Sequence, residues 1–286
     1  AAGPRPPPRT ARRPHGEPRP PRLARPPPAR ARRGRQPTSP AGRLERFFQD
    51  HLLVHTHVEK SGGTSFTAAL VEILGRRHVL DLRGSQQIPP AALNERERAA
   101  VWALTGHFQH GDHVRHFRRA PLSIAITRDP LERFFSFYRF VRTQPSHPQH
   151  AEIAGRGFEA VVEDFLERHH HAAIDYLARK VHGTLPCTRS ALLRRAEHDF
   201  FLVAPQEQLD AVIALLWRTL GEEPPPPPLR HRVGIKAPLE LSAAGRRRFE
   251  AANALDYALH AYVTERAPRR LFEAERRLSL LLAAVD

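Results

Sequence analysis

Short apolar runs alternate along this chain with longer segments in which apolar residues recur every three or four positions. Runs of four to seven apolar residues are typical of buried strands, and the longer period is typical of amphipathic helices. The strand candidates are residues 51–57, 79–82, 101–105, 122–127 and 200–203. Strands that alternate with helices predict an α/β fold with a central parallel sheet flanked by helices on both faces.

The helical period is clearest after Pro130, a residue that is tolerated in a first helical turn. Phe134, Phe137, Tyr138 and Val141 follow at positions that share one face of a helix. Further helices are expected at residues 64–75, 94–98, 158–171, 172–182 and 206–220. The end of the chain predicts two helices, residues 242–266 and 269–284, because Pro268 between them lacks a donor N–H.

The positive charge of the chain is concentrated at its start. Residues 1–44 hold twelve arginines and one acid, Glu17, which leaves only +4 of the net +15 for the remaining 242 residues. Few large apolar residues offset the ordering entropy of this segment, so it predicts a disordered Arg/Pro-rich tail before a folded domain at residues 45–286. Such a tail could contact an acidic membrane surface electrostatically. No nucleic-acid partner is expected for the folded domain.

Composition also sets expectations for the cellular setting. No run approaches the 18 apolar residues that a membrane helix needs, and residues 1–44 lack the apolar core of a secretory signal. The single cysteine, Cys187, excludes an internal disulfide framework. A cytoplasmic protein is therefore expected, with membrane-surface association through the tail left open. The run of prolines at residues 224–228 predicts a stiff surface connection.

The first strand candidate leads into a stretch with the chemistry of a phosphate site. Its sequence is Lys60, Ser61, Gly62, Gly63, Thr64 and Ser65, followed by a predicted helix. Glycines allow a tight turn, and the N–H groups at a helix start attract anions. The lysine adds a full charge and the hydroxyls add donors, so a phosphate-binding loop is the first hypothesis.

Two more strand ends carry groups that suit the same ligand. His107 follows the run at 101–105, and Arg128 follows the run at 122–127 with Ser136 eight residues further on. Alone, these residues would be a structural histidine, a helix cap and an ordinary serine. Since ligands bind at the carboxyl ends of parallel strands, the set together predicts a site for a ligand with at least two separated anionic groups.

The spacing differs from the common nucleotide-triphosphatase loop, in which the lysine follows the second glycine. A phosphate-loop kinase or nucleotidase would also need a magnesium-binding aspartate at a strand end, and none stands out. A second alternative is a basic nucleic-acid or membrane-binding module that works through its tail. His107, His110, His113 and His116 recur every three residues, but with no accompanying cysteine or carboxylate pattern they predict no metal site.

These motifs resemble those of the sulfotransferases, specifically the carbohydrate type related to heparan sulfate 2-O-sulfotransferase and its bacterial relatives. Residues 60–66 are similar to the 5′-phosphosulfate loop of that family, and residues 126–138 to its 3′-phosphate motif, an Arg-Asp-Pro followed by Arg and Ser-x-Tyr. Residues 104–108, 201–209 and 253–257 resemble further family segments. The resemblance spans residues 50–265 and implies a three-layer, P-loop-like fold.

The resemblance also implies a donor and the roles of individual residues. The donor would be 3′-phosphoadenosine 5′-phosphosulfate (PAPS), used as a co-substrate without a metal. Its 5′ phosphosulfate would be held by Lys60, Ser61, Gly62, Gly63, Thr64 and Ser65, and its 3′ phosphate by Arg128 and Ser136. His107 would be the general base, Lys60 would stabilise the leaving oxygen, and the acceptor would be a hydroxyl of a carbohydrate-like molecule.

The chain departs from the family pattern in two places. Glu59 stands where the family commonly has proline, and an acid beside an anion site is unexpected. Alternation along an extended backbone would turn it away from the side of Lys60. His169, His170 and His171 stand before Tyr176, where the family offers an asparagine. Closure over the nucleotide by Arg230, Arg232 or Lys236 is left open.

Overall fold

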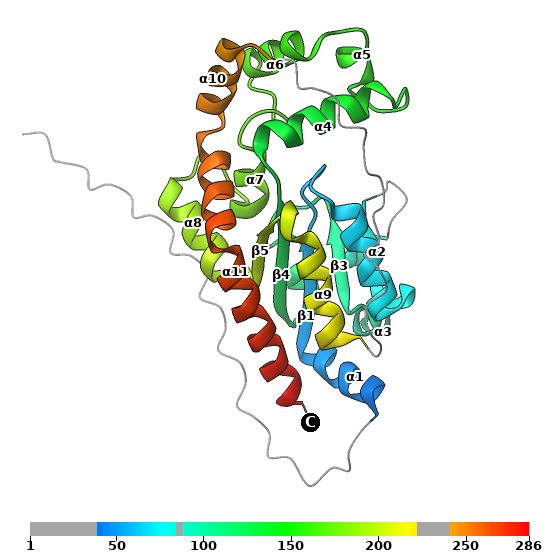
Figure 1. Cartoon of the computed structure of the whole chain (residues 1–286). Helices are drawn as coiled ribbons and strands as arrows, with labels where there is room; N and C mark the ends of the chain where they lie inside the picture. The colour runs from blue at the N-terminus through cyan, green and yellow to red at the C-terminus, as the bar shows by residue number, and fades with distance from the viewer. Residues whose placement is uncertain (1–38, 84–87, 222–240, 286) are drawn as a thin grey trace, which may run out of the picture. The chain divides into compact units, whose positions relative to one another are not determined.

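Five parallel strands form the centre of the computed structural model, which describes residues 39–83, 88–221 and 241–285 (Figure 1). The strands are β1 His51–Thr56, β2 Val79–Leu82, β3 Ala103–Gly106, β4 Ala120–Thr127 and β5 Leu202–Pro205. Their order is β2-β3-β1-β4-β5, and every neighbouring pair runs parallel. The predicted α/β fold with a central parallel sheet is confirmed.

The central strands are apolar on both faces because helices cover both faces. In β1, Leu53 joins the core on one side of the sheet, while Leu52 and Val54 join a cluster on the other side. In β4, Ile124 and Ala125 divide in the same way. A continuous apolar run is therefore the expected sequence for these strands, and that pattern made them visible in the sequence.

Each face of the sheet has its own helices. One face packs against α1 Pro40–Asp50, α2 Gly63–Leu74, α9 Leu209–Leu220 and the C-terminal half of α11 Ala254–Ala283. The other face packs against α7 Tyr176–His182, α8 Arg189–His198 and the N-terminal half of α11. The residues that flank α3 Glu95–Ala100 cover the same side near β3. Short 3-10 turns connect several elements: Arg76–His78, Pro90–Ala92, Val114–His116 and Gln206–Gln208.

A second, aromatic cluster lies beyond the carboxyl ends of the strands (Figure 1). It unites α4 Pro130–Arg142, α5 His150–Ile153, α6 Phe158–Glu167 and α10 Ala243–Ala252. Helix α4 begins at Pro130, and the Asp129 side chain accepts a hydrogen bond from the Glu132 N–H at 2.9 Å. This cap fixes the direction in which the chain leaves β4.

Two of the expected boundaries are wrong. No break occurs at Pro268: α11 runs through it, and the chain bends instead at Asn253, between α10 and α11. Leu259, Val263, Ala267, Ala274 and Leu278 are buried along α11, so packing over the whole length of the helix outweighs the lost hydrogen bond. Residues 40–44 belong to α1 and not to the predicted tail, because Leu44, Phe47 and Phe48 are buried against the sheet.

Other predicted boundaries shift by smaller amounts. Helix α6 ends at Glu167 and α7 begins at Tyr176, with turns between them where the sequence predicted continuous helix. Helix α8 was not predicted, because only Leu192 and Ala196 on it are buried. Most of the predicted tail, residues 1–38, and the proline run at 224–228 lie outside the described residues. Among the described helices, none combines the length and apolarity that crossing a membrane requires.

Candidate functional site

The three motif-bearing strands are neighbours in the sheet. Strand β1 lies between β3 and β4, and Thr56 at its end pairs in register with Gly106 and with Ala125. The His57 N–H continues this pairing by donating to the Gly106 carbonyl at 2.8 Å. The segments that carry Lys60, His107 and Arg128 therefore leave the sheet side by side, as the sequence motifs required.

The loop after β1 depends on its two glycines. Gly62 is the N-cap of α2 with φ of 84°, and the helix begins without a side-chain cap, so no cap side chain competes with an anion for its first N–H groups. A Cβ on Gly63 would lie 2.1 Å from the His57 ring, and one on Gly62 would lie 2.7 Å from Leu209. Only glycine fits at these two positions.

Lys60 has a strained backbone at the apex of this loop. Its φ is 67°, a region that residues with a side chain rarely adopt and that often marks functional loops. Its amine lies 4.1 Å from the centre of the Phe140 ring on α4. The loop and α4 are therefore in direct contact across the carboxyl ends of the strands.

Arg128 lies against the same loop. Its Nη1 donates to the Lys60 carbonyl oxygen at 3.2 Å, and its Nη2 lies 3.1 Å from the Glu132 carboxylate. The two cationic residues predicted to bind an extended dianion thus belong to one surface, although 68 positions separate them in the sequence. Their guanidinium and amine are the charges that separated phosphate groups require.

Ser136 is half-buried on α4. It lies one turn after Glu132 and one turn before Phe140, so the three residues share one face of the helix. Glu132 meets Arg128 and Phe140 meets Lys60, so this face looks towards the loop. Ser136 therefore shares the face of α4 whose other residues contact Arg128 and Lys60, and its role at a 3′ phosphate stays a prediction.

The hydroxyl residues of the loop differ in their surroundings. Ser61 is fully buried and its N–H donates to the Val58 carbonyl at 3.3 Å, so it shapes the turn. Ser65 is also buried, in the first turn of α2. The Thr64 hydroxyl accepts from Arg83 Nη1 at 3.4 Å. Of the three hydroxyls, that of Thr64 is the most accessible to a ligand.

His107 is paired with an acid. Its Nδ1 lies 3.1 Å from Glu59 Oε1, and the two side chains are 37% and 31% exposed. Glu59 and Lys60 do point to different partners, but the cause is the left-handed turn at Lys60 and not the extended backbone that the sequence suggested. The unexpected acid is therefore a partner of the predicted base.

Two more histidines stand behind His107. The His57 ring meets it edge to face at 4.6 Å and stacks on His55 at 5.2 Å. His55 Nδ1 lies 2.8 Å from the Thr105 hydroxyl, which is 3.0 Å from the hydroxyl of Thr67 on α2. This buried polar chain ties β1, β3 and α2 together directly below the loop.

All three histidines favour the neutral form. Burial lowers the pKa of His107, the charge of Glu59 opposes that shift, and Lys180 and Arg83 reinforce it. Burial also lowers the pKa of His55 to about 3 and depresses the pKa of His57 strongly. A neutral imidazole has a lone pair available, so His107 can accept a proton at neutral pH.

Helix α7 supports His107 from the other side. The Lys180 amine, on a side chain that is almost fully buried, donates to the His107 backbone carbonyl. The Tyr176 ring lies 4.1 Å from the guanidinium of Arg133, which is fully buried and donates to the Ala172 carbonyl. Arg133 belongs to the same Arg-Asp-Pro segment as Arg128, so the segment anchors the base side as well as the donor side.

Two buried residues near the start of α11 fix the position of α7. Asp256 accepts from the N–H groups of Leu177 and Ala178 at 2.9 and 2.8 Å, and Asn253 accepts from the Asp175 N–H at 3.1 Å. Burial raises the pKa of Asp256 to about 6, although these hydrogen bonds and Arg133 oppose the shift. The segment 253–257, singled out in the sequence, thus acts as the cap of α7.

The structure adds residues that the sequence did not indicate. Arg83 follows β2, is bound by Asp81 through an ion pair at 2.5 Å, and reaches Thr64. Lys180 had no motif around it. A basic residue placed after an edge strand was the one available signal for Arg83, since β2 ends at the same edge of the sheet as the other motifs.

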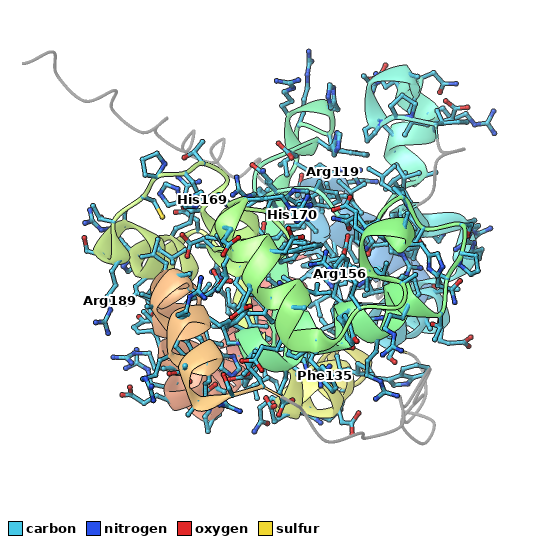
Figure 2. All side chains as sticks on the ribbon, turned by 90° about the horizontal axis from the view of Figure 1, so that it is seen from above. Arg119, Phe135, Arg156, His169, His170 and Arg189 are labelled. Carbon is cyan, nitrogen blue, oxygen red and sulfur yellow. The ribbon has the colours of Figure 1, made fainter. Side chains whose placement is uncertain are left out.

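His110 and the run at 169–171 lie outside this constellation, whereas His260 on α11 contacts the Thr127 hydroxyl at the end of β4 at 3.3 Å. His110 packs on Phe200 with ring centres 4.3 Å apart, and the described residues contain no group of three metal-ligating side chains. His169 and His171 are exposed, and His170 packs on Phe165; His169 and His170 are labelled in the view from above (Figure 2). Arg230, Arg232 and Lys236 lie outside the described residues.

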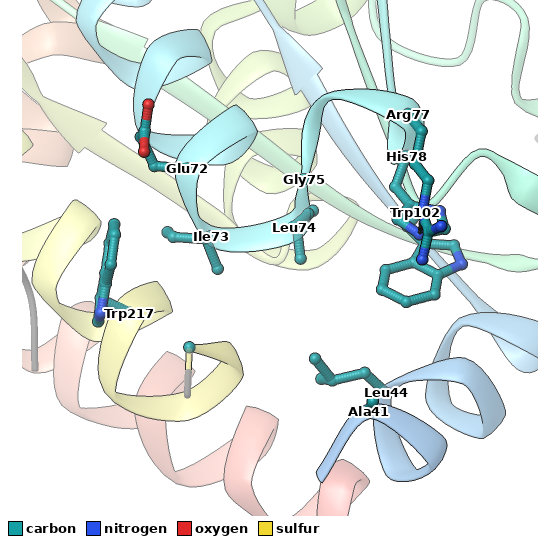
Figure 3. A pocket seen from close by; sticks show the side chains of 11 residues that line it. Ala41, Leu44, Glu72, Ile73, Leu74, Gly75, Arg77, His78, Trp102 and Trp217 are labelled. Carbon is teal, nitrogen blue, oxygen red and sulfur yellow. Dashed lines mark hydrogen bonds between the residues drawn. The ribbon is translucent and has the colours of Figure 1, made fainter. Parts of the chain in front are cut away.

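A cavity of about 400 Å³ lies elsewhere, among α1, α2 and α9 (Figure 3). Trp102 and His78 line it with stacked rings whose centres are 3.6 Å apart. His78 directly precedes β2 and Trp102 directly precedes β3. The cavity is therefore at the amino ends of the strands, away from the motifs. Because ligands of parallel sheets bind at the carboxyl ends, we assign the functional site to the strand-end motifs.

Comparison with known proteins finds similarity over the part of the chain that carries these motifs. Residues 46–182, which contain every predicted site residue, match the model of the sulfotransferase family. Heparan sulfate 2-O-sulfotransferase 1 of Mus musculus is 28% identical over 108 residues, 33% of this chain and 30% of that protein. The Xenopus laevis protein of the same name is 29% identical with the same coverage, so the chain spans about a third of the length of these relatives. Together with the parallel sheet and its strand-end motifs, these matches show that residues 46–182 are similar to the sulfotransferase family.

Proposed function

We propose that this protein transfers a sulfuryl group from PAPS to a hydroxyl of a carbohydrate-like acceptor, with His107 as general base. One observation carries the proposal: Arg128 donates to the backbone carbonyl of Lys60, so two cations from neighbouring strand ends share one surface beside an uncapped helix start. A donor with a 5′ phosphosulfate and a 3′ phosphate presents the two separated anionic groups that match this arrangement.

The donor would lie along the loop and α4. Lys60 and the first N–H groups of α2 would hold the 5′ phosphosulfate, with Thr64 adding a hydroxyl. Arg128 and Ser136 would hold the 3′ phosphate, and the planar guanidinium suits two parallel hydrogen bonds to phosphate oxygens. The Lys60 amine would leave the Phe140 ring and move to the phosphosulfate.

The reaction then needs one proton transfer and one displacement. His107 takes the proton of the acceptor hydroxyl while the acceptor oxygen bonds to sulfur. The bond between sulfur and the bridging oxygen breaks, and its electron pair leaves with 3′,5′-adenosine bisphosphate. Lys60 and the loop N–H groups stabilise the charge on that oxygen, and the loss of one such donor typically costs about 10²–10³-fold in rate.

The acceptor class rests on the relatives, whose name specifies heparan sulfate. The cytoplasmic setting expected from the single cysteine stays a prediction, as does membrane contact through residues 1–44. In this proposal the tail is not needed for catalysis, so deletion of residues 1–38 should leave the transfer rate largely unchanged.

Calorimetric titration with 3′,5′-adenosine bisphosphate tests the donor site. We expect binding by the wild type and markedly weaker binding in Lys60→Ala and in Arg128→Ala. Arg248→Ala is the matched control, because Arg248 is exposed and forms surface ion pairs with Glu163 and Glu167. Transfer of labelled sulfate from PAPS to heparan sulfate then tests the acceptor class.

A kinase or nucleotidase is the outcome that would contradict this proposal. It would require an acidic magnesium ligand near the loop, but Asp129 caps α4 and Asp81 is held by Arg83. Tighter binding of ATP with magnesium than of the bisphosphate would favour that alternative. Equal binding by the wild type, Lys60→Ala and Arg128→Ala would reject the assignment of the donor site.

A further inference from the structure

Among the residues that the structure describes, Glu59 is the acid in direct contact with the predicted base. Its Oε1 lies 3.1 Å from Nδ1 of His107, and both side chains reach the surface at the end of β1. Glu59 also precedes Lys60, which has a left-handed backbone and whose own side chain contacts Phe140 on α4. The acid and the cation thus have different partners, His107 and Phe140.

A neutral imidazole carries its proton on one of its two nitrogens, and its hydrogen-bond partner decides which one. A carboxylate can only accept, so Nδ1 must be the protonated nitrogen in the Glu59–His107 contact. Nε2 is then left as the nitrogen with a free lone pair. The orientation of the ring is fixed by the same contact.

We infer that Glu59 is a positioning residue that holds His107 in the Nδ1–H form and so directs its Nε2 to the acceptor proton. This inference rests on the proposed function for its purpose, but the contact itself can be measured without any turnover. It also accounts for an acid beside an anion-binding loop. The carboxylate is engaged by the imidazole and is turned away from the face where Lys60 contacts α4.

Neighbouring groups hold both members of the pair. The Lys180 amine binds the backbone carbonyl of His107, which fixes the base from the α7 side. Burial raises the pKa of the Tyr176 hydroxyl and the charge of Glu59 adds to that shift, while the same charge favours the charged form of the buried Arg133 guanidinium. The charge of Glu59 is therefore felt by the Tyr176–Arg133 pair as well as by the imidazole.

The charge of Glu59 has a consequence of defined sign. It raises the pKa of His107 against burial, so its removal should lower the pKa of His107. The other charged or titratable groups that act on this imidazole stay in place in a Glu59 variant: Lys180, Arg83, Asp81 and His57. A downward change would therefore report the loss of this carboxylate.

Nitrogen-15 spectroscopy of labelled histidines measures both properties in the full-length protein. His107→Asn assigns the resonance, and the ring shifts of the wild type should report a protonated Nδ1 and an unprotonated Nε2. In Glu59→Ala we expect a mixture of the two forms and a lower pKa for His107. Glu59→Gln should retain the Nδ1–H form through its amide oxygen while the pKa of His107 still falls.

Glu163→Gln is the matched control, because Glu163 pairs only with Arg248 on the surface. The inference is overturned if the proton position and the pKa of His107 are the same in Glu59→Ala as in the wild type. Should Glu59→Ala fail to fold, Glu59→Gln and Glu59→Asp carry the test, and an unchanged pKa in Glu59→Gln would be equally decisive.

Titration with 3′,5′-adenosine bisphosphate separates this inference from the proposed function. Retained binding in Glu59→Ala would show that the donor site is intact, so a change at His107 would belong to the base alone. Failure of the wild type to bind the bisphosphate would reject the donor assignment and leave the spectroscopic result standing. With an accepted substrate, Glu59→Ala should lower kcat by about 10²-fold, the smaller end of what a general base contributes.

Discussion

The two sides of the candidate site are built in different ways. The donor side, Lys60 to Ser65 with Arg128 and Ser136, comes from two strand-to-helix segments that follow adjacent strands. The base side, Glu59 and His107 with Tyr176 and Lys180, depends on contacts between residues as far as 73 positions apart. The first is local chain geometry repeated at two strand ends, and the second is tertiary packing of α7 onto the loop after β3.

This difference separates binding from chemistry. An anion can be held by any strand end that offers N–H groups and a cation. Each segment of the donor side can therefore bind its anionic group through its own local geometry. A base works only when one nitrogen is directed to one proton, so it requires the second layer that α7 provides. Variants on the two sides should therefore separate donor affinity from turnover.

The largest effect is expected from His107→Ala. Removal of the general base should reduce kcat by about 10²–10⁴-fold and leave the affinity for 3′,5′-adenosine bisphosphate near the wild-type value. The first quantity is measured by transfer of labelled sulfate from PAPS, and the second by calorimetry.

His150→Ala provides the control for losing an imidazole, because His150 is bound to the Val141 carbonyl near the far end of α4. Loss of donor binding in His107→Ala would show that the two sides are one inseparable unit. Undiminished turnover would place the base elsewhere, with Glu59 as the first residue to examine.

Arg128 gives the converse result. Hydrogen bonds to charged groups contribute about 1.5–3 kcal/mol, so Arg128→Ala should weaken bisphosphate binding by roughly 10–100-fold. Arg128→Lys keeps the charge but loses the planar guanidinium, so its affinity for the bisphosphate should lie between those of the wild type and Arg128→Ala. Titrations at two salt concentrations would measure both variants against the wild type. Equal affinities for the lysine and alanine variants would mean that hydrogen-bond geometry, and not charge, holds the 3′ phosphate.

The sequence located the residues of the proposed donor side at adjacent strand ends because its signals are local. Apolar runs marked the strands, and the glycines, Lys60 and Arg128 stood directly after them. Parallel strands end at one edge, so the register of β1 with β3 and β4 brings these residues together without further information. His107 was predicted on the same grounds.

The base side was less visible because its partners are set by packing. No pattern in α7 indicates that Lys180 meets the His107 carbonyl, and Glu59 was expected simply to turn away. The helix through Pro268 shows the same limit: the buried stripe of α11 against β5 and α9 overrides a local signal. Local rules locate motifs, whereas their surroundings depend on long-range contacts.

A smaller effect is expected where the two sides touch. Gly63 belongs to the donor loop, and its missing Cβ leaves space for the His57 ring that packs on His107. Gly63→Ala should cost about 1–3 kcal/mol of unfolding free energy through overpacking and should weaken both bisphosphate binding and turnover. Urea unfolding and calorimetry measure the two consequences. Gly157→Ala is the matched control, since nothing lies within 4 Å of a Cβ there. If Gly63→Ala weakens only bisphosphate binding or only turnover, the contact does not link the donor loop to the base.

The smallest effect concerns the anchor of the base side, Asp256. Burial raises its pKa to about 6 from a usual value of 3.8, so between these pH values the folded state binds its proton more tightly than the unfolded state does. Its contribution to stability is therefore complete below pH 3.8 and is lost as the pH rises through 6, with a slope of at most about 1.4 kcal/mol per pH unit.

Asp256→Asn removes this titration. Urea unfolding between pH 4 and 7 should then show a difference between wild type and variant that changes across this window, whereas Glu163→Gln should follow the wild type throughout. Parallel curves for wild type and Asp256→Asn would mean that the carboxylate titrates normally in the folded protein, and the cap of α7 would then be an ordinary hydrogen-bonded aspartate without an electrostatic penalty.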